Sequence, residues 1–263
     1  MSNTPLEFAV FTKPWPTEPI PELAKLVAGL GFNGAEIPVR PGFQVTPDNV
    51  GKMLPELISV FGDHGLKVVS IASGLEEPIF AACAEAGVPM IRIMGSIERG
   101  AYLQSEEALR TQLGGVIPLC ERYGVRIGVQ EHYGDNVSDA FALRSLLQGL
   151  DDRWITAIWD AAHDALAGIE PETGLDVVWD RLAMVNLKNA YYERTNGPEA
   201  EAAEWHRHFT SGSQGLASWP RIAAELRRRD YSGPVCLTAE YEEPADVARL
   251  CRQDLHYVKE LFG

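Results

Sequence analysis

One short unit recurs along the chain: an amphipathic helix, then a glycine, then a short apolar strand. The segments that follow such glycines are GAEIPV, KVVSIA, PMIRIMG, VRIGVQE and PVCLTAE. Glycine just past a helix adopts the left-handed conformation that closes the last helical turn. Short apolar segments rich in β-branched residues are typical of parallel strands that are buried on both faces. The sequence therefore predicts strands and helices that alternate around a parallel sheet.

The number of strand-like segments favours a closed barrel. Eight strands are predicted, near residues 7–12, 35–39, 67–72, 90–95, 126–131, 155–160, 183–188 and 235–240. Eight strands with intervening helices in about 250 residues match a (β/α)8 barrel. A doubly wound open sheet is the alternative, but it usually carries a glycine-rich phosphate turn after its first strand, and FTKPWP contains none.

No linker or change in composition divides the chain, so we expect residues 1–263 to form one α/β domain, a (β/α)8 TIM barrel. The longest stretch without a clear element, residues 191–215, is expected to form a loop over the barrel mouth.

Composition excludes several classes of protein. The net charge of −14 repels the phosphate backbone of nucleic acids and disfavours anionic membrane surfaces. No apolar run approaches the ~20 residues that span a bilayer, and the first residues lack the pattern of a secretory signal. The four cysteines form no C-x-x-C pair and are expected to be reduced packing residues. We therefore expect a cytoplasmic protein without nucleic-acid or membrane partners.

Polar residues gather at the ends of the last four predicted strands, where a barrel of this kind places its chemistry. These residues are Glu131, Asp160, Asn186, Lys188 and Glu240. Period-two alternation groups Glu131 with Ile127 and Val129, and we expect this face to meet the polar ends of the other strands. Three carboxylates in one pocket require raised pKa values or a cation among them. Oxygen ligands of this kind suit Mg²⁺ or Mn²⁺.

At these positions the chain resembles the xylose-isomerase-like superfamily of sugar isomerases, epimerases and related lyases. The resemblance rests on GAE at 34–36, QEH at 130–132, DAAH at 160–163, VNLKN at 185–189, GLASW at 215–219 and YSGP at 231–234, followed by Glu240. It implies a barrel that binds a divalent cation, often Mn²⁺, through Glu, Asp, His and Glu. Carried over, the predicted ligands are Glu131, Asp160 and Glu240, with Asn186 as the fourth, since its side-chain oxygen stands where the family has its histidine.

The resemblance also implies a reaction. Isomerases and epimerases of this family move a proton on a carbon beside a carbonyl, and the cation stabilises the enediolate. Glu131 and Glu240 are predicted to remove and return that proton. The predicted substrate-binding residues are His163, Lys188, Glu36 and His208. For His206 and His208 three interpretations stay open: substrate contacts, a ligand that completes the metal shell, or a solvent-exposed pair.

The predicted function is thus a metal-dependent isomerase or epimerase that acts on a small carbohydrate, polyol or keto-sugar. One alternative is a lyase or dehydratase that uses the same site on a keto-sugar or inosose. Another is a degenerate sugar-binding barrel without catalysis. The DNA-repair version of this barrel is disfavoured by the charge of −14. Barrels of this family often pair, so a homo-oligomer is one expectation.

Overall fold

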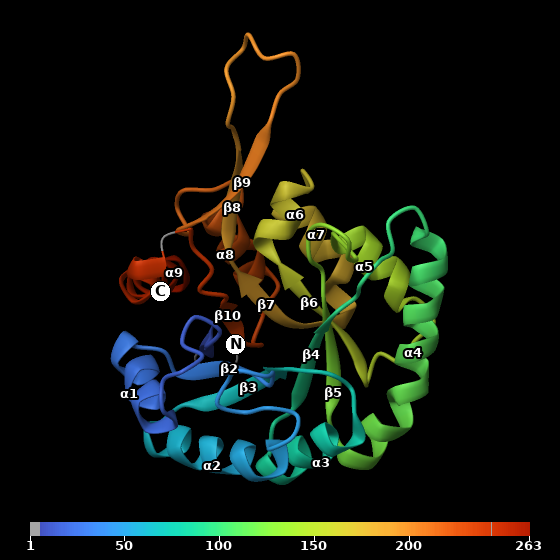
Figure 1. Ribbon diagram of the computed structural model, residues 1–263, viewed down its shortest axis with the longest axis vertical. Coiled ribbons are helices and arrows are strands. Elements are labelled where there is room, and N and C mark those ends of the chain that lie inside the picture. Colours follow the sequence, from blue (N-terminus) through green and yellow to red (C-terminus); the bar gives the residue numbers. More distant parts are fainter. Residues whose placement is uncertain (1–5, 243) are drawn as a thin grey trace.

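Eight parallel strands close into a barrel in the computed structural model, which describes residues 6–242 and 244–263 (Figure 1). The strands are β1 (Phe8–Phe11), β2 (Gly34–Pro38), β3 (Lys67–Ala72), β4 (Met90–Met94), β5 (Arg126–Gln130), β6 (Ile155–Asp160), β7 (Leu182–Leu187) and β10 (Val235–Leu237). Each strand pairs with its neighbours along the chain, and β1 pairs with β10 to close the ring. The predicted (β/α)8 barrel is confirmed, and each predicted strand overlaps one strand of the ring.

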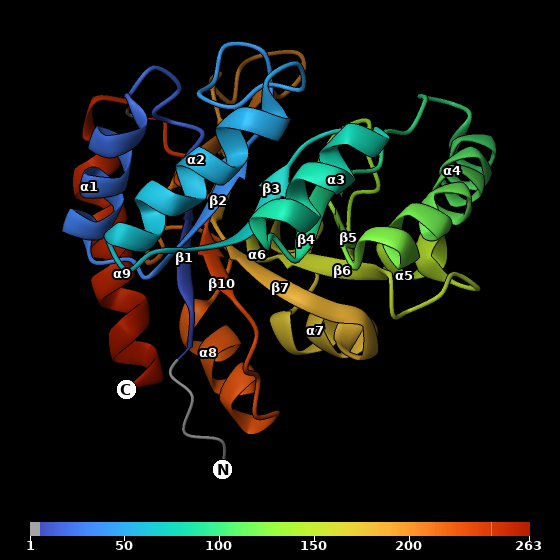
Figure 2. The same cartoon turned by 90° about the horizontal axis from the view of Figure 1, so that it is seen from below.

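Helices surround the barrel (Figure 2). They are α1 (Ile20–Leu30), α2 (Val50–Asp63), α3 (Glu77–Ala86), α4 (Tyr102–Tyr123), α5 (Ala140–Leu147), α6 (Ala161–Leu166), α7 (Pro171–Val178), α8 (Trp219–Arg228) and α9 (Val247–Phe262), with 3₁₀ turns η1 (Trp179–Arg181) and η2 (Pro244–Asp246). Gly31, Gly87 and Gly124 follow α1, α3 and α4 with φ of 97°, 73° and 67°, as the recurring unit predicts. Among the described residues, no helix combines the length and the apolar character needed to cross a membrane.

Apolar side chains pack on both sides of the strand wall. Those inside the barrel are Ala9, Phe11, Val69, Ala72, Met90, Ile158, Met184 and Cys236. Ile127 and Val129 of β5 belong instead to the layer between strands and helices. Gly128 lies between them and faces inward, because a Cβ there would stand 2.5 Å from the Ile158 side chain. Gln130 shares the inward face of β5 with Gly128. All four cysteines are buried and unbonded, as predicted.

A two-stranded antiparallel sheet, the hairpin of β8 (Asn189–Arg194) and β9 (Trp205–Thr210), projects from the barrel between β7 and α8 (Figure 1). The prediction of a structureless loop over residues 191–215 is therefore wrong. The strands of the hairpin have few buried apolar residues, and Trp205 is 63% exposed. One face of β9 carries Trp205, Arg207 and Phe209, so apolar and charged residues are mixed on it and the sequence shows no clean hydrophobic alternation.

Candidate active site

A layer of polar side chains lies at the C-terminal end of the barrel interior, above the apolar layer. Its members are Glu36, Arg92, Gln130, Asp160, Asn186, Lys188 and Thr238, each at most 5% exposed, together with Glu240. A cavity of about 620 Å³ opens beside this layer, with Lys13, His132, Tyr133, Phe209 and Glu240 among its lining residues. A narrow extension of about 50 Å³ reaches Arg92, Gln130, Lys188 and Thr238. This opening at the ends of the strands is the candidate active site.

Lys188 lies at the centre of the polar layer. Its Nζ is 2.9 Å from Oε2 of Glu240 and 2.9 Å from Nε2 of His163. The same nitrogen lies 3.7 Å from Oδ2 of Asp160 and 4.9 Å from the ring centre of Phe209. The side chain of Lys188 is only 2% exposed. A buried ammonium group thus joins two carboxylates from the ends of β6 and β10, the strands on either side of β7.

The charges around Lys188 support one another. Burial alone would lower the pKa of Lys188, but Asp160 and Glu240 outweigh it and raise that pKa. Burial would raise the pKa of Glu240, but Lys188 and Lys13 hold it well below its usual value. Oε1 of Glu240 accepts a 2.7 Å hydrogen bond from Nζ of Lys13. At neutral pH the site therefore contains a lysine cation beside an ionised Glu240.

His163 contributes a neutral imidazole to the site. Burial, then the charge of Lys188, keeps the pKa of His163 well below its usual value. Because the ammonium group donates to Nε2, the ring proton is assigned to Nδ1. The predicted set His163, Lys188, Asp160 and Glu240 is thus brought together.

A hydrogen-bonded chain crosses the floor of the site. Nε of Arg92 donates to Oε1 of Glu36 over 2.7 Å, and NH1 of Arg92 donates to Oε1 of Gln130 over 2.5 Å. Nε2 of Gln130 then donates to Oδ2 of Asp160 over 2.8 Å. Oε1 of Glu36 also accepts from Oγ of Ser70. Glu36, a predicted substrate-binding residue, therefore holds the buried Arg92 through Oε1, and its Oε2 has no partner among the described residues.

Glu131 lies apart from this network. It follows Ile127 and Val129 on the outward face of β5, whereas Asp160 points into the barrel, so the prediction that these faces coincide is wrong. Its Oε1 accepts a 2.5 Å hydrogen bond from the backbone N–H of Asp160. Burial, then the charge of Asp164, raises the pKa of Glu131 well above its usual value.

Gln130 and His132 occupy the inward positions around Glu131, and neither was predicted to be a site residue. The available signal was Gly128, since a glycine in the middle of a strand marks a crowded face. His132 lines the cavity, and its Nδ1 lies 3.0 Å from the carbonyl oxygen of Tyr133. Burial, then Lys188, lowers the pKa of His132 to about 4. The site thus contains a second neutral imidazole.

The hairpin covers one side of the site with alternate residues of β9. Phe209 lines the cavity, and the guanidinium carbon of Arg207 lies 3.3 Å from the ring centre of Tyr133. His208, a predicted substrate-binding residue, lies on the other face of β9, with Nε2 2.7 Å from Oε2 of Glu193. Arg207 and Phe209, rather than His208, therefore face the mouth.

The strand-end residues do not fit a bound Mn²⁺ or Mg²⁺. Gln130 replaces the expected glutamate, and the amide of Asn186 has no partner among the described residues. Oδ1 of Asp160 caps α6 by accepting from two backbone N–H groups. The positive charge between Asp160 and Glu240 is already that of Lys188. Hard divalent cations select anionic oxygen donors with free lone pairs, and this set has few.

A different group of side chains could hold a metal ion. His206, His208 and Glu242 offer ligand atoms that all lie within 4.8 Å of one another. The two histidines lie on the face of β9 opposite Arg207 and Phe209, and Glu242 also lines the cavity.

Two curated proteins similar to this chain are named inosose dehydratases. An inosose dehydratase of Bacillus velezensis is 26% identical over 128 residues, 47% of this chain and 43% of that relative. An inosose dehydratase of Geobacillus kaustophilus is 25% identical over 144 residues, 53% of this chain and 46% of that relative. The chain thus spans about half the length of the curated relatives it matches.

Solved structures with the same fold include a 3-keto-D-glucoside 4-epimerase from E. coli, with a TM-score of 0.72 and 16% identity over 97% of this chain and 100% of that one. A probable 3-DHS dehydratase from Bacillus anthracis has a TM-score of 0.73 and 12% identity over 97% and 99% of the two chains. At such identities these likenesses show the fold alone. A family model described as the xylose isomerase-like TIM barrel matches residues 24–261, so the chain belongs to that family.

Proposed function

We propose that this chain is an enzyme that moves a proton on the carbon beside the carbonyl group of a keto-sugar or keto-polyol. The observation that carries the proposal is the buried ammonium group of Lys188, held between Asp160 and Glu240 at the mouth of the barrel. A preorganised cation in a site shielded from water stabilises the oxygen that becomes negative in an enediolate. Lys188 then has the role that a divalent cation was predicted to have.

Proton transfer is assigned to groups that line the cavity. Glu240 is ionised and 21% exposed, so its carboxylate can accept the proton from the substrate carbon. After Glu240 takes the proton from carbon, the same carboxyl group returns it to carbon. His132 is the proposed second carrier: its Nδ1 is engaged by the Tyr133 carbonyl, so the free Nε2 can take the proton of the substrate hydroxyl and pass it to the former carbonyl oxygen. Neutral His163, bonded to Lys188, orients the ammonium group. Asn186 is proposed to bind a substrate hydroxyl with its unpartnered amide.

Two reaction classes share this first step. An isomerase or epimerase returns the proton to carbon, whereas a dehydratase expels a hydroxyl group from the next carbon. Isomerisation or epimerisation is the first candidate, since His132 and Glu240 provide two separate carriers at the cavity. The dehydratase is the second candidate, because both curated relatives described above carry that name.

The charge at the mouth favours a substrate with a carboxylate or phosphate group. Arg40 lines the narrow extension of the cavity, together with Arg92. Burial, then the charge of Arg92, lowers the pKa of Arg40. No carboxylate of the described residues lies within 4.0 Å of the Arg40 or Arg207 guanidinium group. An anionic group on the substrate would relieve the repulsion between Arg40 and Arg92. The chain as a whole carries −14, so two guanidinium groups without a carboxylate partner among the described residues stand out from the rest of the molecule.

The test is deuterium exchange followed by proton NMR. The protein is incubated in D2O with a panel of keto-sugars and keto-polyols, each with and without a carboxylate or phosphate. The signal beside the carbonyl should disappear for at least one anionic member, and the product then separates epimer from dehydrated ketone. Glu240→Gln should abolish exchange while the circular dichroism spectrum is kept, and the exposed Glu107→Gln is the matched control. Two results would overturn the proposal: deuterium exchange that persists in Glu240→Gln, or no deuterium exchange by the unsubstituted protein with any compound of the panel.

A further inference from the structure

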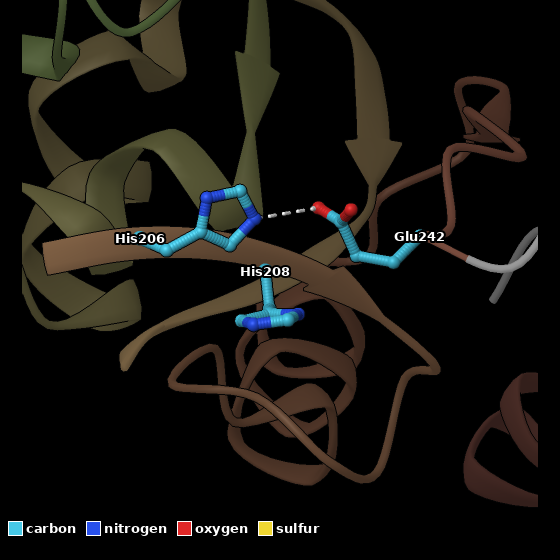
Figure 3. Close-up of side chains that lie close together, drawn as sticks. All are labelled: His206, His208 and Glu242. Atoms are coloured by element: carbon cyan, nitrogen blue, oxygen red, sulfur yellow. Dashed lines mark ion pairs between the residues drawn. The ribbon is translucent and has the colours of Figure 1, made fainter. Parts of the chain in front are cut away.

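We propose a second functional element, independent of the reaction: a binding site for a transition-metal dication such as Zn²⁺ between the hairpin and the segment after β10. Its ligands are His206, His208 and Glu242 (Figure 3). Two imidazoles with one carboxylate form a donor set that suits Zn²⁺ and its neighbours in the first transition row.

The backbone brings these ligands together from two distant parts of the chain. His206 and His208 are two residues apart in β9, so both side chains point to the same face of the hairpin. Glu242 follows β10 and is fixed against β9 in two ways. Its N–H donates to the carbonyl of Phe209 over 3.1 Å, and its Oε1 accepts from the N–H of Phe209 over 3.3 Å.

The distances are close to those of a bound ion. The three ligand atoms lie within 4.8 Å of one another, and tetrahedral ligands about 2.1 Å from a zinc ion stand about 3.4 Å apart. Nε2 of His206 is 3.7 Å from Oε1 of Glu242, and the two imidazole centres are 4.6 Å apart. Small side-chain rotations therefore close the triad around one ion.

Neighbouring residues hold the imidazoles in place. Nε2 of His208 lies 2.7 Å from Oε2 of Glu193, which faces His206 across the hairpin. The ring of Tyr191 stacks on His208, with centres 5.2 Å apart and planes inclined by 13°. Glu193 is thus placed to be a fourth ligand or to orient His208, as carboxylates do beside metal-bound histidines.

A metal at this position would fasten the hairpin to the segment after β10. Both segments also face the mouth, through Phe209 and Glu240. The proposed ion therefore strengthens the outer wall of the cavity, and its role is structural.

The test is isothermal titration of the full-length, tag-free, EDTA-treated protein with ZnCl2, together with the visible spectrum of the Co²⁺-loaded protein. We expect one equivalent of Zn²⁺ to bind and a Co²⁺ spectrum with nitrogen and oxygen ligands. His206→Ala and His208→Ala should each weaken binding at least about tenfold, roughly the effect of losing one ligand interaction. His256→Ala is the matched control, since His256 is another exposed histidine beside a glutamate, with Nε2 3.2 Å from Oε1 of Glu260.

The proposal is overturned by three results: the absence of stoichiometric binding, unchanged affinity in His206→Ala and His208→Ala, or an equal loss in His256→Ala. If either hairpin variant misfolds, Glu242→Gln provides the same comparison from the other segment. Because the readout is metal binding, its failure leaves the deuterium-exchange test of the reaction unaffected.

Discussion

Removal of the Lys188 ammonium group is the most informative perturbation of the site. Lys188→Met keeps the length and apolar stem of the side chain but leaves Asp160 without its cation at 3.7 Å. Glu240 keeps its hydrogen bond from Lys13, so most of the penalty comes from Asp160. Breaking one side of a buried ion pair costs about 3–5 kcal/mol. We expect Lys188→Met to lower the unfolding free energy by about 3 kcal/mol at neutral pH, the lower end of this range.

The penalty should depend on pH in a defined direction. Burial already raises the pKa of Asp160 above that of an unfolded aspartate, and loss of Lys188 should raise it further. A carboxyl group with a raised folded-state pKa binds more protons in the folded state than in the unfolded state. Stability therefore falls as pH rises through that pKa. The cost of Lys188→Met should be largest above neutral pH and smaller in mild acid.

Urea denaturation followed by tryptophan fluorescence measures this cost, at about pH 7.5 and about pH 5. Lys52→Met, at an exposed position of α2, is the control and should change stability by less than about 0.5 kcal/mol. If Lys188→Met lowers the unfolding free energy by less than about 1 kcal/mol, or by the same amount at both pH values, Asp160 does not depend on the Lys188 cation.

Three further predictions concern the surroundings of the site. Glu131→Gln should change kcat/KM by less than about twofold in steady-state kinetics. The hydrogen bond of 2.5 Å from the Asp160 N–H lies away from the cavity, and the amide oxygen of glutamine can accept it as well. A hundredfold loss of kcat/KM would contradict this prediction. Since burial, then a neighbouring ammonium group, lowers the pKa of His132 to about 4, the pH–rate profile should stay level through the ordinary titration range of histidine and fall only toward pH 4. A fall centred near pH 6.5 would count against His132 as the neutral carrier. Arg92→Leu should lower the unfolding free energy by about 3–5 kcal/mol in urea denaturation, because it leaves Glu36 buried without its ion-pair partner. The double variant Arg92→Leu/Glu36→Leu should lose less stability than Arg92→Leu alone. Additive losses from the two substitutions would show that the pair is not coupled.

The barrel could be predicted from sequence because its signals are local and repeated. Most strands are apolar, and several of the preceding helices end at a glycine in the left-handed conformation, as at Gly87 and Gly124. The hairpin lacked such signals, since aromatic and charged residues are mixed on the same face of its strands.

The site was predicted in part. The ends of β6, β7 and β10 were placed correctly, and Asp160, Lys188 and Glu240 meet there. The end of β5 was placed incorrectly, because a strand that is buried on both faces shows no alternation between apolar and polar residues that would separate its inward from its outward side chains. An error of one residue then exchanges the two faces. The inward residue is therefore Gln130 rather than Glu131.

The pairing of Lys188 with both carboxylates could not have been predicted from strand ends alone. Lys188 follows the last residue of β7, and Lys13 reaches Glu240 from the segment after β1. Such distant contacts decide whether a carboxylate is free to bind a metal. They turn a set of residues that suggested a metal centre into an arrangement balanced by lysine.

We infer that the cation of this site is the Lys188 ammonium group. The test of this inference is the rate of deuterium exchange into a reactive keto-sugar, measured on EDTA-treated protein before and after addition of Mn²⁺. If Lys188 is the cation, deuterium exchange continues without metal, is unchanged by Mn²⁺, and is lost in Lys188→Met. Exchange that stops after EDTA treatment and returns in proportion to added Mn²⁺ would contradict it.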